Sequence, residues 1–347
     1  MGGPSGGEEP AAAVLRRAWA DLSDVVRGDA LGNVWALRRG SAPQPRPVLV
    51  LAAHLDTVGL LITSRLPGGF VRLAPLGALD ARSLLGREVV IAGREAVPAL
   101  VATLPPHLTV PAARRRLPPL PELLLDTGLP DADLARLVRP GDRAHFAAGP
   151  LRLLGDWVAA PGLDNRAGVA ALHEVLCTLG PAVLAADLYV LANVQEEVGL
   201  RGIGAAGRQL RPTAAVVVDV GFGAQPGADE RRTLAPGRGP ALGVGPGLHP
   251  AVGELLEVEA ARLEVPLQRE ILAGPSGTDA WALQVAAGGV PVALLSIPLR
   301  SMHSPAESLD YGDVRCAGEL LAGFAAAVTP EWAAGLRQQL AGAGPGA

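Results

Sequence analysis

Histidine and carboxylate side chains recur at the C-terminal ends of apolar, strand-like segments of this sequence. They are His54 and Asp56 after residues 47–53, Glu196 and Glu197 after 188–194, Asp219 at the end of 214–219, and His303 in the loop after 292–297. In open α/β sheets, ligands bind in the crevice beyond the carboxyl ends of the strands. We therefore expect these side chains to meet at one edge of a sheet.

A further carboxylate, Asp164, stands just before a helical segment. Taken singly, each residue has a simpler interpretation: His54 as a structural histidine, Asp164 as a helix N-cap, Asp219 as a turn residue, and Glu196-Glu197 as a solvated pair. Taken together they favour a metal site, because several carboxylates at the ends of buried strands are costly without a cation between them.

The donor set indicates which metal chemistry to expect. Nitrogen and oxygen ligands without thiolate suit Zn²⁺, Co²⁺ or Mn²⁺. Two histidines and three carboxylates exceed the needs of one catalytic zinc, but they suit two ions that share one carboxylate, as in co-catalytic hydrolases. Asp56, on the same side of an extended strand as His54, is expected to hold the imidazole N–H. Of Glu196 and Glu197, one can bind metal while the other takes a proton from the attacking water.

The elements that must position these residues alternate between helical and strand-like patterns. Helices are expected at residues 11–27, 167–179, 251–263, 278–287 and 313–327, and strands at 33–37, 47–53, 188–194, 214–219, 241–244 and 292–297. This alternation predicts an α/β fold with a mixed sheet and helices on both faces.

Residues 67–155 differ in character from the rest of the chain. They hold short β-like pieces at 87–91, 99–104 and 144–146, separated by Pro-rich turns. We interpret them as a small, mainly β domain inserted into the α/β domain, which then comprises residues 1–66 and 156–347.

Composition narrows the function classes. With 347 residues and 49% hydrophobic content, the chain can bury a sizeable core, and its net charge of −4 gives no basic footprint for nucleic acid or an anionic membrane surface. Two cysteines cannot make a disulfide framework and suit a reducing compartment. Neither a secretory signal nor an uninterrupted 18-residue apolar span is present, so a cytoplasmic location is expected.

Six segments resemble the deblocking, or glutamyl, aminopeptidase family, whose members are di-metal enzymes known for tetrahedral dodecamers. The segments are AHLDTVG (53–59), LDNRAG (163–168), VQEEVGLRG (194–202), VDV (218–220), GTDA (277–280) and PLRSMHSPAE (298–307). They occur in the family's order and span nearly the whole chain.

The resemblance implies a role for each site residue. Asp164 would bridge two divalent metal ions, with Glu197 and His303 completing one site and His54 and Asp219 the other. Glu196 would be the general base and acid, and Asp56 would support the site. The resemblance also implies a cis Asp164–Asn165 peptide.

The activity implied is a metal-dependent aminopeptidase that acts on short peptides, with Zn²⁺ or Co²⁺ and with Mn²⁺ as a further candidate. Residues 67–155 would be the family's dimerisation domain, beginning with a strand at 83–91. We therefore expect a homo-oligomer, either a dimer or a dodecamer built from dimers.

Departures from the family pattern leave alternatives open. Thr57 replaces the usual Glu, and HLDTV is closer to a related carboxypeptidase and deacylase branch. That branch follows its bridging Asp with Lys-Gly, which a chain without lysine cannot have. A glycoside hydrolase or an inactive scaffold has no use for the two histidines. Residues 221–239 are unlike the family, and the loops after Asp219 and near Asp279 are expected to shape the substrate pocket.

Overall fold

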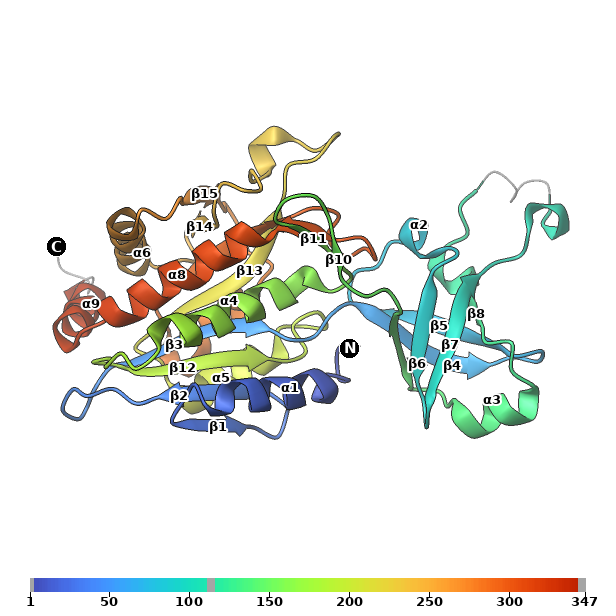
Figure 1. Ribbon diagram of the computed structural model, residues 1–347, viewed down its shortest axis with the longest axis horizontal. Coiled ribbons are helices and arrows are strands. Elements are labelled where there is room, and N and C mark those ends of the chain that lie inside the picture. The colour runs from blue at the N-terminus through green and yellow to red at the C-terminus, as the bar shows by residue number, and fades with distance from the viewer. Residues whose placement is uncertain (1–2, 111–115, 343–347) are drawn as a thin grey trace.

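The chain folds into two parts joined by a narrow connection. The computed structural model describes residues 3–110 and 116–342. Figure 1 shows an α/β part that holds both ends of the chain and a smaller barrel beside it. The N-terminal end of the chain lies near the junction of the two parts, and the C-terminal end lies at the far side of the α/β part.

The α/β part is built on a mixed sheet. In the described residues its eight strands have the spatial order β1 (Val25–Gly28), β2 (Val34–Arg38), β12 (Asp187–Asn193), β3 (Val48–His54), β13 (Ala214–Phe222), β16 (Val292–Leu299), β14 (Ala241–Val244) and β15 (Gln268–Ile271). The four central strands, β12, β3, β13 and β16, are parallel. Their carboxyl ends therefore lie at one edge, which places His54 and Asp219 close together.

Helices cover both faces of this sheet, as the sequence predicts. One face packs against α1 (Glu9–Ala20), α4 (Leu163–Leu179), α6 (Pro250–Leu263) and α8 (Tyr311–Ala327), and the other against α5 (Arg201–Leu210), α7 (Asp279–Leu283) and η5 (Ala286–Gly288). Helix α9 (Pro330–Gly342) follows α8, and η4 (Glu230–Arg232) lies in the loop after β13. The predicted α/β fold is therefore confirmed.

Two predicted helices are shorter than expected. The helix predicted at 11–27 begins at Glu9 and ends at Ala20, and Val25 and Val26 instead pair with β2, because β-branched residues pack well on a pleated surface. The helix predicted at 278–287 ends at Leu283. Ala287, Gly288 and Gly289 all have positive φ, which an α-helix does not accommodate.

The smaller part is a closed antiparallel barrel. Its strands have the order β4 (Gly59–Arg65), β5 (Phe70–Leu76), β8 (Leu124–Asp126), β7 (Ala96–Ala102), β6 (Glu88–Ala92) and β9 (Arg143–Phe146). Helices α2 (Ala81–Leu84), α3 (Asp131–Leu137), η1 (Pro106–Leu108) and η3 (Leu120–Glu122) connect these strands. The barrel has its own apolar core, which includes Ile62, Leu125 and Leu134.

The barrel's limits differ from those expected for the insert. Strand β4 belongs to the barrel although it precedes residue 67, and it follows His54 after a short link. At the other end, β10 (Leu151–Arg152) pairs with β11 (Trp157–Ala159), which pairs with β17 (Ser308–Asp310). The strand expected at 83–91 is also wrong in part, because Asp80 caps helix α2 and Gly86 adopts positive φ, so β6 begins at Glu88.

Among the helices that the structure describes, none combines the length and apolar character that a membrane-spanning segment needs. Both cysteines carry free thiols, with Cys177 exposed and Cys316 half-buried.

Candidate active site

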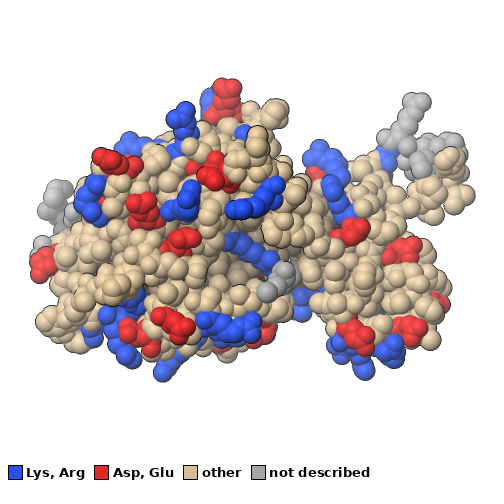
Figure 2. All heavy atoms as spheres, viewed as in Figure 1, with Lys and Arg blue, Asp and Glu red and all other residues tan. Residues whose placement is uncertain are grey.

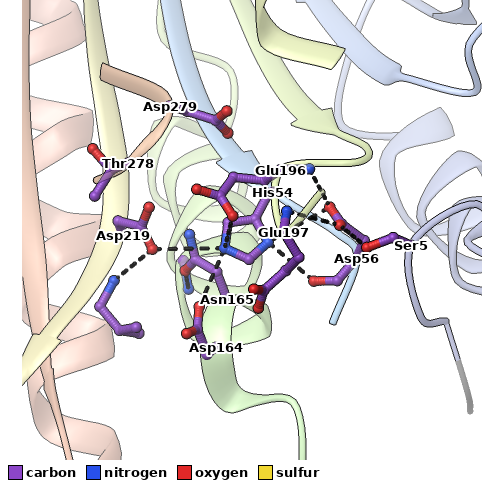
Figure 3. Close-up of polar contacts among 12 residues, drawn as sticks. Ser5, His54, Asp56, Asp164, Asn165, Glu196, Glu197, Asp219, Thr278 and Asp279 are labelled. Atoms are coloured by element: carbon purple, nitrogen blue, oxygen red, sulfur yellow. Dashed lines mark hydrogen bonds and ion pairs between the residues drawn. The ribbon is translucent and has the colours of Figure 1, made fainter. Parts of the chain in front are cut away.

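The carboxylate of Asp164 lies between two histidines. His54 ends β3, and its Nε2 is 3.2 Å from Asp164 Oδ1; His303 Nε2 is 3.0 Å from Asp164 Oδ2. Figure 3 shows Asp164 below the His54 ring, with Asp219 to one side. The Asp164–Asn165 peptide is cis, as the resemblance implies. Asp164 therefore faces both imidazoles instead of capping the helix.

The predicted ligands form two groups that share one residue. The donor atoms of His54, Asp164 and Asp219 lie within 4.8 Å of one another, and so do those of Asp164, Glu197 and His303. A third combination, His54, Glu196 and Glu197, meets the same limit. Every residue predicted to bind metal is thus in one cluster, and Asp164 is common to the first two groups.

The chemistry of this cluster fits divalent cations. Its donors are imidazole nitrogens and carboxylate oxygens, which suit Zn²⁺, Co²⁺ and Mn²⁺. Glu197 Oε1 is buried and has no hydrogen-bond partner among the described residues. Buried carboxylate oxygens normally have partners, so this one indicates a place for a cation.

The pKa shifts of the cluster residues also favour a bound cation. Burial raises the pKa of Glu196 to about 9 and that of Glu197 to about 7, with further contributions from neighbouring carboxylates. The hydrogen bond to Asp164 raises the pKa of His303 to about 9. Burial disfavours the His54 cation, but Asp164 and Asp219 outweigh it and raise the His54 pKa well above its usual value. Without a cation the cluster therefore retains protons, which bound metal ions can replace.

Asp56 supports the cluster differently from the sequence expectation. Its main-chain carbonyl oxygen, rather than its carboxylate, is hydrogen-bonded to His54, with 3.0 Å to Nδ1. The carboxylate is fully buried and accepts the backbone N–H groups of Glu196 at 3.0 Å and Glu197 at 3.2 Å. Asp56 thus fixes both the ring of His54 and the backbone that carries the two glutamates (Figure 3).

Sequence reasoning assigned no role to Glu307, although it closes the PLRSMHSPAE motif. This fully buried side chain accepts the N–H of Asp164 at 3.2 Å and that of His303 at 2.8 Å. It therefore ties together the backbone of two predicted ligands. Its position four residues after His303 is the sequence signal that could have indicated this role.

The N-terminal segment also supports the site, which sequence reasoning missed. Ser5 Oγ donates to Asp56 Oδ2 at 2.7 Å, and Glu8 Oε1 accepts the N–H of Gln195 at 3.3 Å. Thr57 N–H donates to the Gly3 carbonyl at 3.1 Å. These contacts join residues about 50 to 190 positions apart in sequence, and nothing in the sequence near the N-terminus indicates them.

Another buried carboxylate acts on Glu196. Asp279, in the first turn of α7 as expected, accepts the side-chain amide of Asn193 at 2.5 Å. Burial raises the pKa of Asp279 to about 7, and its charge opposes ionisation of Glu196. The Thr278 hydroxyl caps the helix by accepting the N–H of Ala280 at 3.3 Å.

A family model and a curated relative each match most of the chain. Residues 32–320 match the model of the M42 glutamyl aminopeptidase family. The lysyl aminopeptidase of Pyrococcus furiosus is 34% identical over 298 residues, which cover 85% of this chain and 84% of that protein.

Solved structures extend the similarity to the whole fold. The TET aminopeptidase from the marine sediment archaeon Thaumarchaeota archaeon SCGC AB-539-E09 has a TM-score of 0.91 at 27% identity, covering 97% of this chain and 96% of that one. The TET1 peptidase of Pyrococcus horikoshii, described as able to assemble into a tetrahedron or a large octahedral shell, has a TM-score of 0.83 at 28% identity, with 94% and 97% covered.

Proposed function

The chain belongs to the M42 glutamyl aminopeptidase family, and from this we propose that it removes N-terminal residues from short peptides with two divalent metal ions bound per subunit. The observation that carries the proposal is the pair of donor groups that share Asp164. Membership of the family makes the chain a peptide hydrolase; the number of metal ions and the role of each residue belong to the proposal.

We assign Asp164 as the shared ligand, His54 and Asp219 as the remaining ligands of one ion, and Glu197 and His303 as those of the other. The donor set suits Zn²⁺ or Co²⁺, and Mn²⁺ also accepts such ligands. When bound, two such ions polarise the scissile carbonyl and make an attacking water more acidic. The shared carboxylate supports this assignment, because it has one oxygen toward each histidine.

We assign Glu196 as the general base and acid. Its side chain is in the same pocket as the ligands, and its Oε2 is 4.0 Å from His54 Nε2. It takes a proton from the attacking water and returns it to the leaving amine. Asp56 is a positioning residue, since its fully buried carboxylate holds the Glu196 and Glu197 N–H groups.

The proposal is tested with one peptide in two forms, with a free and with an acetylated N-terminus. Mass spectrometry after incubation with the metal-loaded protein is expected to show loss of N-terminal residues from the free form only. Removal of the acetyl group would instead identify a deacylase, and loss of C-terminal residues a carboxypeptidase, the two activities of the related branch.

The barrel is proposed as the surface through which subunits pair. The chain's relative from Pyrococcus horikoshii assembles into shells, which supports a homo-oligomer here. On β7 and in the connection that follows it, Leu100, Leu104, Leu108 and Val110 are between 49% and 72% exposed, and exposed apolar side chains gathered in one segment favour a partner surface. We propose a dimer in which the barrel, residues 59–146, forms the contact between subunits, and a dodecamer built from such dimers. The barrel overlaps most of the insert expected at 67–155.

A cytoplasmic location is also part of the proposal. The exposed thiol of Cys177 and the half-buried thiol of Cys316 are both free, and free thiols persist in reducing compartments.

The preferred N-terminal residue does not follow from the comparisons. One relative is a lysyl aminopeptidase, whereas the family model is named for glutamyl aminopeptidase, so the names give substrates of opposite charge.

A further inference from the structure

The pocket that contains the donor cluster continues along the sheet toward its β15 edge. Its volume is about 550 Å³, and its lining includes Asp219 and His303 at the cluster and Ser296, Glu270 and Leu272 beyond it. A peptide whose first residue lies at the cluster can therefore place that residue's side chain in the extension. The residues of this extension decide which side chains fit.

The register of the sheet and one side-chain contact together account for the position of Glu270. Ser296 on β16 is directly opposite Asp219 on β13, so both side chains are on the same face. Ser296 Oγ donates to Glu270 Oε2 at 2.6 Å. Asp219 and Ser296 lie on adjacent strands, and Glu270 reaches Ser296 from β15 across the intervening strand β14, so the three side chains form a row from the donor cluster to the edge of the sheet.

Gly221 keeps this row accessible. It stands two residues after Asp219 and therefore on the same face. A Cβ atom at Gly221 would lie 2.6 Å from Leu234 Cδ1 and 3.5 Å from Glu270 Oε1. Because no side chain projects at this position, Glu270 Oε1 is open toward the pocket.

Glu270 brings negative charge to the extension without a cationic partner. Among the described residues the Glu270 side chain has no ion pair, and Ser296 is the one hydrogen-bond partner of that side chain. The carboxylate is half-buried, and burial together with the nearby Asp219 raises its pKa. A cation in the pocket would offset the free-energy cost of burying the Glu270 carboxylate, since buried charges are normally paired.

Arg232 also lines the pocket and would favour an acidic side chain instead. It is exposed and lies on the short helix η4, outside the sheet. Glu270 is held by Ser296, which is directly opposite Asp219 in the sheet. An exposed charge is screened by solvent, whereas a half-buried one acts more strongly on a bound ligand.

We propose that Glu270 makes the enzyme selective for peptides with a basic N-terminal residue, Arg or Lys, by pairing with the side-chain cation in this extension. The inference rests on the proposed aminopeptidase function and adds a substrate class to it.

The test compares kcat/KM for four aminoacyl-chromophore substrates that carry Arg, Lys, Leu or Glu. The wild-type protein, Glu270→Gln and Glu257→Gln are measured with metal present. Glu257 is a matched control, because it lies on α6, pairs with Arg269 and is not among the residues that line the pocket of the donor cluster. Arg232→Gln tests the competing interpretation.

We expect the wild-type protein to prefer Arg and Lys, and Glu270→Gln to lose about 30-fold or more in kcat/KM on both while Leu changes little, since a buried charge pair loses its partner. Glu257→Gln should match the wild type. The inference is overturned if the wild type has its highest kcat/KM on the Glu or Leu substrate, or if Glu270→Gln lowers kcat/KM equally on all four substrates. It is also overturned if Arg232→Gln alone changes the preference among the substrates. No hydrolysis of any substrate would overturn the proposed function itself, and the inference with it.

Discussion

Asp56 holds the backbone of Glu196: its Oδ1 accepts the Glu196 N–H at 3.0 Å, from a position with no exposure to solvent. The second oxygen of the same carboxylate accepts from Glu197 N–H and from Ser5 Oγ. The proposed base and a proposed metal ligand are therefore oriented by one buried group, which must accept from every donor around it.

Replacing Asp56 with Asn tests this positioning role. The Asn amide nitrogen is a donor, so it cannot accept from both the Glu197 N–H and the Ser5 hydroxyl, as the second carboxylate oxygen does. We expect Asp56→Asn to lower kcat by about 10- to 100-fold, the usual effect of groups that orient a metal site, with KM changed much less. Ser5→Ala, which removes one of three donors, should have a smaller effect. A wild-type kcat for Asp56→Asn at full metal content would contradict the role.

The two adjacent glutamates should respond differently to the same substitution. Glu196→Gln is expected to keep both metal ions but to lose on the order of 10² to 10⁴ in turnover, because ligands remain while proton transfer stops. Glu197→Gln should instead weaken one metal site. Elemental analysis combined with kcat gives the answer, and depleted metal in Glu196→Gln with full metal in Glu197→Gln would reverse the two assignments.

Metal uptake should release protons. Burial raises the pKa of Glu196 to about 9 and of Glu197 to about 7, and the Asp164 hydrogen bond raises the pKa of His303 to about 9. In the metal-free protein at pH 7, Glu196 and His303 therefore carry protons and Glu197 is partly protonated, and bound metal ions favour loss of these protons. Apparent Zn²⁺ affinity should therefore rise from pH 6 to pH 9. Calorimetry in two buffers of different ionisation enthalpy measures the release, and identical heats at pH 7 would argue against it.

The assembly is tested by light scattering on the purified protein. We expect a particle larger than the 35.4 kDa chain, because the apolar surface of the barrel must be covered. A monodisperse monomer would refute both the dimer and the dodecamer. A dimer that does not grow with concentration or added metal would refute the dodecamer alone.

The sequence predicts the site better than it predicts the barrel, and the reasons are physical. His54, Asp164, Glu197, Asp219 and His303 stand at strand ends or just before a helix, where the topology of a parallel sheet brings them together. The barrel strand β4 was not separated from the core segment, because its apolar residues continue those of β3 after a short link.

Other features depend on contacts that leave no local pattern. Ser5 reaches Asp56 across 51 positions of sequence, and only the folded chain brings them together. Glu270 lies on the short edge strand β15, whose sequence, Gln-Arg-Glu-Ile, is mostly polar and gives little strand signal. Its place in the pocket comes from its contact with Ser296 on another strand.

The requirement for two divalent ions per chain can be measured by titrating metal into chelator-treated protein while an aminoacyl-chromophore substrate is hydrolysed. We expect no activity at the start, a rise on addition of Zn²⁺ or Co²⁺ that reaches a plateau at two equivalents per chain, and loss of activity when chelator is restored. Full activity in the chelated protein, or metal-independent release of sugar from a glycoside, would contradict it.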